Sequence, residues 1–134
     1  MILAICIDDK NGISFNKRRQ SRDSLLIKDL METAGERKVF ISSYSLSLFS
    51  GYEDRITVDN SFIDSAGDED ICFVEVTDPS SFIDRINGII LYRWNRHYPS
   101  DKKLTLDMSA FKLDSTEEFR GSSHELITRE VYVR

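Results

Sequence analysis

The sequence predicts a three-layer α/β domain whose mostly parallel central sheet ends in a C-terminal antiparallel hairpin. Over the first two thirds of the chain, short apolar runs alternate with helical patterns, as in strand–helix–strand units around a parallel sheet. The last third carries β-type patterns, including a period-two run at 125–133. A chain of 134 residues is the length of one domain, residues 1–134.

The predicted elements of the first 35 residues follow from apolar spacing and capping residues. Residues 2–7 form a continuous apolar run, as in a strand buried on both faces. Residues 14–24 are polar and basic without a hydrophobic period, so we expect a long loop. Apolar residues then recur at helical spacing; Asp23 or Ser24 can cap this helix, and Gly35 can close it.

The elements expected between residues 38 and 66 are short. Residues 38–42 and 55–59 are rich in β-branched or aromatic side chains and are predicted strands. The serine-rich segment between them predicts a short helix, with Ser43 as its cap and Gly51 as its end. We expect one further helical turn at residues 62–66.

The second half of the chain opens with "DICFVEV", residues 70–76, which predicts a buried strand. A helix should follow, capped by Asp78, with Pro79 at its first position and Gly88 at its end. The remaining predicted segments are a strand at 88–94, a loop at 97–103 and two β segments at 110–118 and 125–133.

Composition and charge argue against several classes of protein. Hydrophobic residues make up 40% and charged residues 31%, as in globular proteins. No apolar run reaches the roughly 20 residues that span a bilayer, so we expect a cytoplasmic protein without a membrane partner. Cys6 and Cys72 lie in apolar runs without a second metal ligand nearby, which predicts reduced thiols and no metal site. The net charge of −5 argues against a broad nucleic-acid surface.

Five segments carry a family resemblance: "MILAICIDDKNGI", "RKVFISSYSLSLFSG", "DRITVD", "DICFVEVTDPSSFIDRINGIILYRW" and "SDKKLTLD…FKLDSTEEFRGSSHELITREVYVR". In this order they resemble the dihydrofolate reductases over nearly the whole chain. The chain is shorter than a full member, and the missing length falls between Asp59 and Asp70. The resemblance implies a dihydrofolate reductase-like fold with a pterin cleft beside a nicotinamide cofactor site.

Both cofactor motifs of the resembled family are replaced in this chain. Glu75 and Val76 stand where the family carries a glycine pair, and a Cβ there limits close backbone approach to a pyrophosphate. A Glu75 carboxylate turned toward that pyrophosphate would add a repulsion of at most roughly 4 kcal/mol. Ser-Ser-Tyr-Ser, residues 42–45, replaces the family's Gly-Arg-x-Thr. We therefore expect no cofactor and no normal NADPH binding.

The resemblance also implies which residues line the substrate cleft. Asp23 is the candidate for the acid that orients a pterin, and an isolated carboxylate in an apolar cleft would have a raised pKa. Its alternative role is the helix cap. The other implied cleft residues are Cys6, Ile27, Val74 and Tyr92.

Three functions remain open from the sequence. The first is a diverged relative, without normal reductase activity, that binds a small molecule or a protein partner; whether it is an enzyme is left open. The second is an atypical NAD(P)H-dependent reductase of a pterin-like substrate, aided by free amides at the helix beginning at Pro79. Its phosphate ligands would be Ser43, Ser45, Thr77 and Ser80.

The third function is an RNA- or nucleotide-binding module. Its surface would combine the arginines of residues 16–22 and 92–98 with stacking aromatic rings, namely Tyr92, Trp94 and Tyr98. The negative net charge favours instead a solvated loop and strand end. Exposed edge strands would also allow a homodimer.

Two further polar groups have plain interpretations. Asp8 and Asp9 follow the first strand and are expected to form a solvated turn rather than a metal pair. Ser122, Ser123 and His124 are consecutive, but neighbouring residues rarely form a nucleophile–base pair and no elbow motif surrounds them. The sequence therefore predicts no hydrolase.

Overall fold

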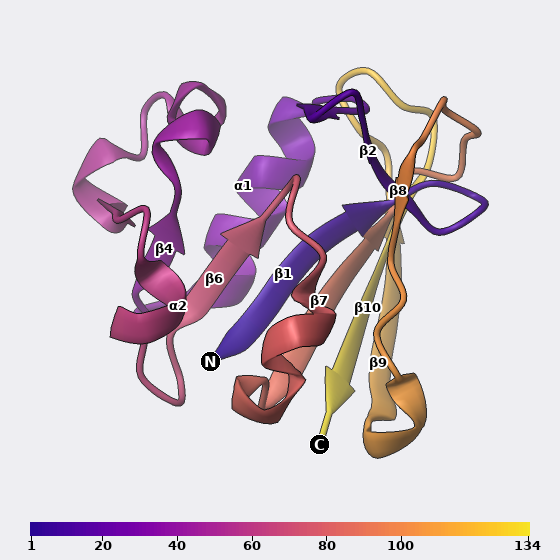
Figure 1. The fold of residues 1–134 in the computed structure, drawn as a ribbon. Helices are drawn as coiled ribbons and strands as arrows, with labels where there is room; N and C mark the ends of the chain where they lie inside the picture. The colour runs from indigo at the N-terminus through magenta and orange to yellow at the C-terminus, as the bar shows by residue number, and fades with distance from the viewer.

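The computed structural model describes all residues 1–134 and is built around one seven-stranded sheet in the order β5-β4-β6-β1-β7-β10-β9 (Figure 1). β1, β4, β5, β6 and β7 run parallel, and β10 is antiparallel to both β7 and β9. The predicted mostly parallel sheet with a C-terminal antiparallel hairpin is confirmed. The strands are β1 (Ile2–Ile7), β4 (Val39–Ile41), β5 (Ile56–Val58), β6 (Ile71–Val74), β7 (Gly88–Arg93), β9 (Lys112–Phe119) and β10 (Ile127–Val133).

The core lies on both faces of this sheet because its central strands are apolar on both sides. In β1, Leu3 and Ile5 belong to one buried cluster, and Ala4 belongs to the other. Helix α1 (Ser24–Ala34) covers the Ala4 face with its buried side chains. Short helices and the chain around Phe111 cover the Leu3 face. The result is three layers with the sheet in the middle.

Helix α1 begins and ends where its capping residues predict. Asp23 is the N-cap and accepts hydrogen bonds from the backbone amides of Leu25 and Leu26. Gly35 closes the helix with a φ of 59°, a backbone angle that favours glycine. The start of α1 is therefore fixed at the carboxylate that the sequence also marks as a candidate site residue.

The prediction of a long loop at residues 14–24 is wrong, because a small β-hairpin occupies much of this segment. β2 (Gly12–Phe15) and β3 (Arg18–Arg19) pair antiparallel, and β8 (Lys102–Lys103) joins them in a second sheet of order β3-β2-β8. Asn16 and Lys17 form the two-residue turn with φ of 51° and 60°, the arrangement of a type I′ hairpin. The turn lacks the usual glycine, so the sequence signal is weak.

The remaining helical segments are short, and three predictions about their ends need correction. The segment after β4 is a 3-10 helix that follows Ser42 and ends before Ser50, not at Ser43 and Gly51. The predicted helix after Pro79 is a pair of 3-10 turns, and Gly88 belongs to β7. These segments are η1 (Ser43–Phe49), η2 (Glu53–Arg55), α2 (Phe62–Ser65), η3 (Pro79–Arg85) and η4 (Met108–Ala110). No helix has the length and apolar character needed to cross a membrane.

Candidate functional site

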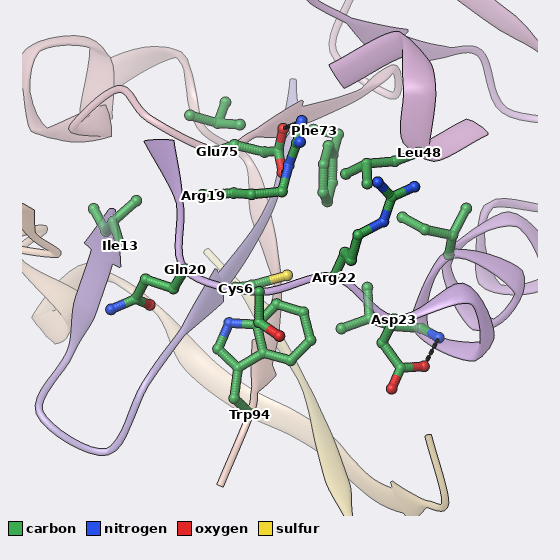
Figure 2. A pocket seen from close by; sticks show the side chains of 14 residues that line it. Cys6, Ile13, Arg19, Gln20, Arg22, Asp23, Leu48, Phe73, Glu75 and Trp94 are labelled. Atoms are coloured by element: carbon green, nitrogen blue, oxygen red, sulfur yellow. Dashed lines mark hydrogen bonds and ion pairs between the residues drawn. The ribbon is translucent and has the colours of Figure 1, made fainter. Parts of the chain in front are cut away.

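A cavity lies between α1, the β2–β3 hairpin and the carboxyl ends of β1 and β6 (Figure 2). Open α/β sheets bind ligands at this edge, where neighbouring connections leave on opposite sides of the sheet. Leu26, Leu48, Phe73 and Trp94 give the wall its apolar character. The cavity volume is about 20 Å³, which is room for about one water molecule. The cleft is thus present and closed.

Four of the five side chains expected in the cleft line this cavity, and the fifth does not. Cys6, Asp23, Ile27 and Val74 are part of its wall. Tyr92 is fully buried, and its hydroxyl donates a hydrogen bond to Asp29 at 2.7 Å. Burial first, and the neighbouring Asp29 second, raise the pKa of Tyr92 far above its usual value.

The Asp23 carboxylate is saturated with hydrogen bonds rather than isolated. Its Oδ1 accepts from the amides of Leu25, Leu26 and Ser122 at 3.0, 3.2 and 2.8 Å. Its Oδ2 accepts from the Ser123 amide and pairs with His124 Nδ1, both at 2.9 Å. Burial would raise its pKa, but these bonds outweigh burial and hold the pKa of Asp23 well below its usual range. The raised pKa expected from the sequence is wrong.

The hydrogen-bond donors around the Asp23 carboxylate are called the Asp23 cradle. The loop between β9 and β10 supplies part of this cradle because it approaches Asp23 very closely. A Cβ added at Gly121 would overlap Asp23 Oδ2 and lie 2.8 Å from Ile127 Cδ1. The loop is closed by a hydrogen bond from the Gly121 amide to the His124 carbonyl at 3.0 Å. Only a residue without a Cβ leaves room for the carboxylate here.

The imidazole of His124 extends the Asp23 cradle toward two hydroxyl groups. His124 Nε2 lies 2.8 Å from the Tyr98 hydroxyl and 3.2 Å from Ser21 Oγ. The ring stacks on Trp94 with 4.5 Å between centroids, and the His124 side chain is 1% exposed. Sequence reasoning considered only the serines next to His124 and missed Ser21 and Tyr98, which are 103 and 26 residues away.

At the other end of the cavity, Arg19 and Glu75 form a two-point ion pair. Arg19 Nε and one terminal nitrogen lie 2.8 and 3.0 Å from the two Glu75 carboxylate oxygens. Ser45 Oγ donates to Glu75 at 2.8 Å, and the Arg19 guanidinium lies over the Tyr44 ring at 4.4 Å. The hydrogen bonds to Glu75 raise the pKa of Arg19 further. Figure 2 shows this pair on the far side of Cys6 from Trp94.

This ion pair changes the electrostatic expectation for Glu75. The sequence shows no arginine in the motif after the second strand, yet the fold brings Arg19 of the β2–β3 hairpin to Tyr44. Arg19 and Ser45 both bind Glu75. Glu75 therefore carries a neutralising partner, and the expected repulsion of a phosphate is reduced. The barrier to a ligand at this point is the space that the paired side chains occupy.

None of the four predicted phosphate ligands lines the cavity. Ser43 and Thr77 are exposed, and Ser45 is buried with its hydroxyl on Glu75. Ser80 Oγ donates to Asp78 at 2.7 Å. The Asp78 carboxylate also accepts from the Ser80 amide at 3.1 Å, so a carboxylate already occupies the amide end of η3. One of the amides expected to be free after Pro79, that of Ser80, is therefore occupied.

The prediction that aromatic rings form an exposed stacking surface for nucleic acid is also wrong. Tyr92 and Trp94 are buried at 0% and 5% exposure, so their faces are closed to bases. Tyr98 is partly buried and packs edge-on against His124. Arg93 is paired with Glu130 at 2.8 Å.

Asp8 is buried, which corrects the expected solvated turn. Its carboxylate accepts from the amides of Lys10, Gly12 and Tyr98 and from the Gln20 side chain. These bonds outweigh burial and lower the pKa of Asp8.

No group of three or more His, Cys, Asp or Glu side chains is placed to hold a metal ion. Cys6 and Cys72 are free thiols, and burial raises the pKa of Cys72 to about 12.

Comparison with known proteins gives a relation of fold only. No family model matches the chain, and no curated protein matches it. Among solved structures, it is similar to dihydrofolate reductase from Enterococcus faecalis complexed with NADP(H) and RAB-propyl. The TM-score is 0.65 at 12% sequence identity, covering 100% of this chain and 96% of that chain. The chain therefore has a dihydrofolate reductase-like fold.

Proposed function

We propose that this protein, with its dihydrofolate reductase-like fold, binds a small molecule in the cleft at the carboxyl ends of β1 and β6 and lacks normal NADPH-dependent reductase activity. The observation that carries the proposal is the Arg19–Glu75 pair. It stands at the end of β6, where the resembled family places a glycine pair against the cofactor pyrophosphate. Two large side chains occupy the space that those glycines leave free.

A nucleotide would have to break this pair before it could bind in that position. The Glu75 and Arg19 side chains are 8% and 20% exposed, so water screens their attraction only in part. Separating them would cost about 1–3 kcal/mol. That cost lowers affinity roughly 5- to 150-fold. The ligand would also gain no glycine backbone contact at Glu75 and Val76.

The wall of the cavity supports a small, largely apolar ligand. Small-molecule sites combine an apolar wall with a few converging polar groups. Here Phe73, Ile27 and Trp94 supply the apolar wall, and the Cys6 thiol and the Ser21 hydroxyl are polar groups at its surface. Because Asp23 is already saturated, it offers no free carboxylate oxygen for orienting a basic heterocycle, which counts against an atypical reductase.

Calorimetric titration with NADPH, together with an absorbance assay of dihydrofolate reduction, tests the loss of the cofactor site. We expect no binding at millimolar NADPH and no turnover. The double variant Glu75→Gly/Val76→Gly, which restores the glycine pair, should bind NADPH at least about tenfold more tightly than the parent. Glu75→Gln, which keeps the volume and removes only the ion pair, is the matched control and should gain less affinity than the double variant. Micromolar binding with turnover in the parent would overturn the proposal.

Thermal shift with pterins, pyrimidines, nucleosides and small aromatic carboxylates tests the retained cleft. A ligand that binds only the folded protein raises the melting temperature. We expect at least one compound to do so in the parent and not in Ile27→Trp, whose side chain would fill the cavity. If no compound raises the melting temperature, or if Ile27→Trp responds equally, the cleft is not the binding site.

A further inference from the structure

Ser21, His124 and Asp23 form a connected row of side chains at the Trp94 end of the cavity. His124 Nδ1 lies 2.9 Å from Asp23 Oδ2, and its Nε2 lies 3.2 Å from Ser21 Oγ. We propose that this row is a hydroxyl-activating triad in which Ser21 attacks small carboxylic esters. A nucleophile within hydrogen-bond reach of a base that a third group orients defines such a site by geometry, whatever the order in sequence.

The protonation pattern of the row follows from Asp23. Its carboxylate is ionised, since its pKa is held well below the usual range by the amides and by His124. An ionised carboxylate can only accept a hydrogen bond, so the tautomer that fits this contact carries its proton on Nδ1. Nε2 then carries the lone pair and faces Ser21. This is the tautomer that a general base needs.

The imidazole is held in one orientation by its surroundings. Trp94 stacks on it with an interplanar angle of 24°, and Tyr98 packs against its edge. Asp23 is fixed in turn by backbone amides of the 121–124 loop and of α1. A base whose position is fixed before substrate arrives loses no free energy in becoming ordered during the reaction.

Ser21 lies on the wall of the closed cavity, where a substrate that opens the cleft would meet it. The residue is partly buried and lines the cavity, whereas Ser122 and Ser123 do not line it. The backbone amides of Ser21 and Arg22 make no hydrogen bond within the chain, so neither is committed to another acceptor if an oxyanion develops beside it. The Arg22 guanidinium forms no ion pair and extends toward Phe73 and Leu48 in Figure 2. The apolar wall would receive the acyl group.

The proposed reaction has two balanced steps. Ser21 Oγ forms a bond to the ester carbonyl carbon while His124 Nε2 takes the hydroxyl proton. The bond from that carbon to the leaving oxygen then breaks, and the alcohol leaves with the proton from His124. Water, deprotonated by His124, attacks the acyl-serine, the acyl–Oγ bond breaks and the proton returns to Ser21. The sequence needs no nucleotide or metal, so its test and the NADPH test can fail separately.

Tyr98 competes with Ser21 for the base in the resting protein. Its hydroxyl lies 2.8 Å from His124 Nε2 and 3.3 Å from Ser21 Oγ. A single phenol proton can be donated to only one of them at a time. Without this hydroxyl, Ser21 should be the only hydroxyl group that donates to His124 Nε2. The Tyr98→Phe variant therefore distinguishes a serine nucleophile from a tyrosine nucleophile.

Hydrolysis of p-nitrophenyl acetate and labelling with a fluorophosphonate test the triad on the full chain. We expect hydrolysis above the buffer rate, a fall of about 100-fold or more in Ser21→Ala and His124→Asn, and a phosphonyl adduct located on Ser21 by mass spectrometry. Tyr98→Phe, which keeps the ring and removes the competing hydroxyl, should increase the rate. Ser65→Ala, a change of a serine on α2 away from the cavity, should leave the rate unchanged. Circular dichroism melting confirms that each variant is folded.

Other results of the same experiments would overturn the proposal. A Ser21→Ala rate equal to the parent rate, or an adduct only on another residue, overturns the proposal. Loss of the reaction in Tyr98→Phe with retention in Ser21→Ala also overturns it and assigns the nucleophile to the tyrosine. If His124→Asn fails to fold, Ser21→Ala and the adduct position still decide, because Ser21 contributes only one hydroxyl to the network.

Discussion

Two carboxylates mark the two ends of the cleft, and the protein holds them in different ways. Asp23 accepts four hydrogen bonds from backbone amides, and its side chain is fully buried. Glu75 accepts only from side chains, those of Arg19 and Ser45. Backbone donors that belong to a helix and a closed loop cannot turn away, whereas side chains can rotate. The Asp23 end is therefore rigid, and the Glu75 end can open.

The elements that carry the donors to Asp23 and to Glu75 also differ in how firmly the fold holds them. The 121–124 loop joins β9 to β10, and β10 is paired along its length with β7 in the main sheet. Arg19 belongs to the two-residue strand β3 at the edge of the small sheet. We infer that a ligand entering the cleft displaces the hairpin rather than the loop. The predictions below test this difference, from the largest effect to the smallest.

Replacing Asp23 by alanine should cause the largest loss of stability. The amides of Ser122 and Ser123 and the His124 imidazole would lose their partner in a buried place, and α1 would lose its cap. We expect a loss of about 3–5 kcal/mol in the free energy of unfolding, measured by urea denaturation. Asp78→Ala, which removes a more exposed capping carboxylate, is the matched control and should cost about 1 kcal/mol. Equal losses would show that the cradle adds nothing to the cap.

A methyl group at position 121 should destabilise the same end of the cleft. In Gly121→Ala the new Cβ would contact Asp23 and Ile127 at distances that force the loop to move. We expect a loss of about 1–3 kcal/mol by thermal or urea unfolding. Gly67→Ala, where the added carbon would meet only the flexible Asp70 side chain at 3.3 Å, is the control. An unchanged midpoint for Gly121→Ala would mean that the loop adapts and that the cradle is not rigid.

Acid should remove the stabilisation that ionised Asp23 provides. Because the folded pKa of Asp23 lies below the unfolded value of about 3.9, the ionised carboxylate stabilises the fold fully above that pH. This contribution is lost as the pH falls from about 4 through the lower folded pKa. Urea unfolding of the parent and of Asp23→Asn at several pH values should give curves that converge on acidification. Parallel curves would contradict the assignment.

Weakening the Arg19–Glu75 pair should have a small effect on stability and a larger one on opening. Glu75→Gln removes one charge of the pair but keeps an amide oxygen that can still accept from Arg19 and Ser45, so we expect a loss of about 1 kcal/mol, at the low end of the cost of separating the pair. Hydrogen exchange should become faster for amides of the β2–β3 hairpin and stay unchanged in the 121–124 loop. Faster exchange in both regions would show that the two ends of the cleft open together.

The main strands along the chain and the ends of α1 could be predicted because their signals are local. Apolar runs mark β1, β6 and β7, and Asp23 with Gly35 marks the ends of α1. The site could be predicted only in part. Arg19 is brought to Glu75 from 56 residues away, and His124 reaches Asp23 across 101 residues. Such pairs depend on tertiary approach, which neither periodicity nor capping chemistry encodes. The β2–β3 hairpin was missed because Asn16 and Lys17 take a turn that glycine usually marks.

Asp23 is far in sequence from the donors of the 121–124 loop, so the Asp23 end of the cleft is completed late in synthesis and folding. Helix α1 is synthesised early, but its capping carboxylate meets Ser122, Ser123 and His124 only after the loop between β9 and β10 exists. Closing so long a stretch of chain carries an entropic cost that non-local contacts repay only late in folding. A nascent chain therefore carries α1 with half of its cradle missing. The cleft becomes a finished site only when the last hairpin has docked beside β7.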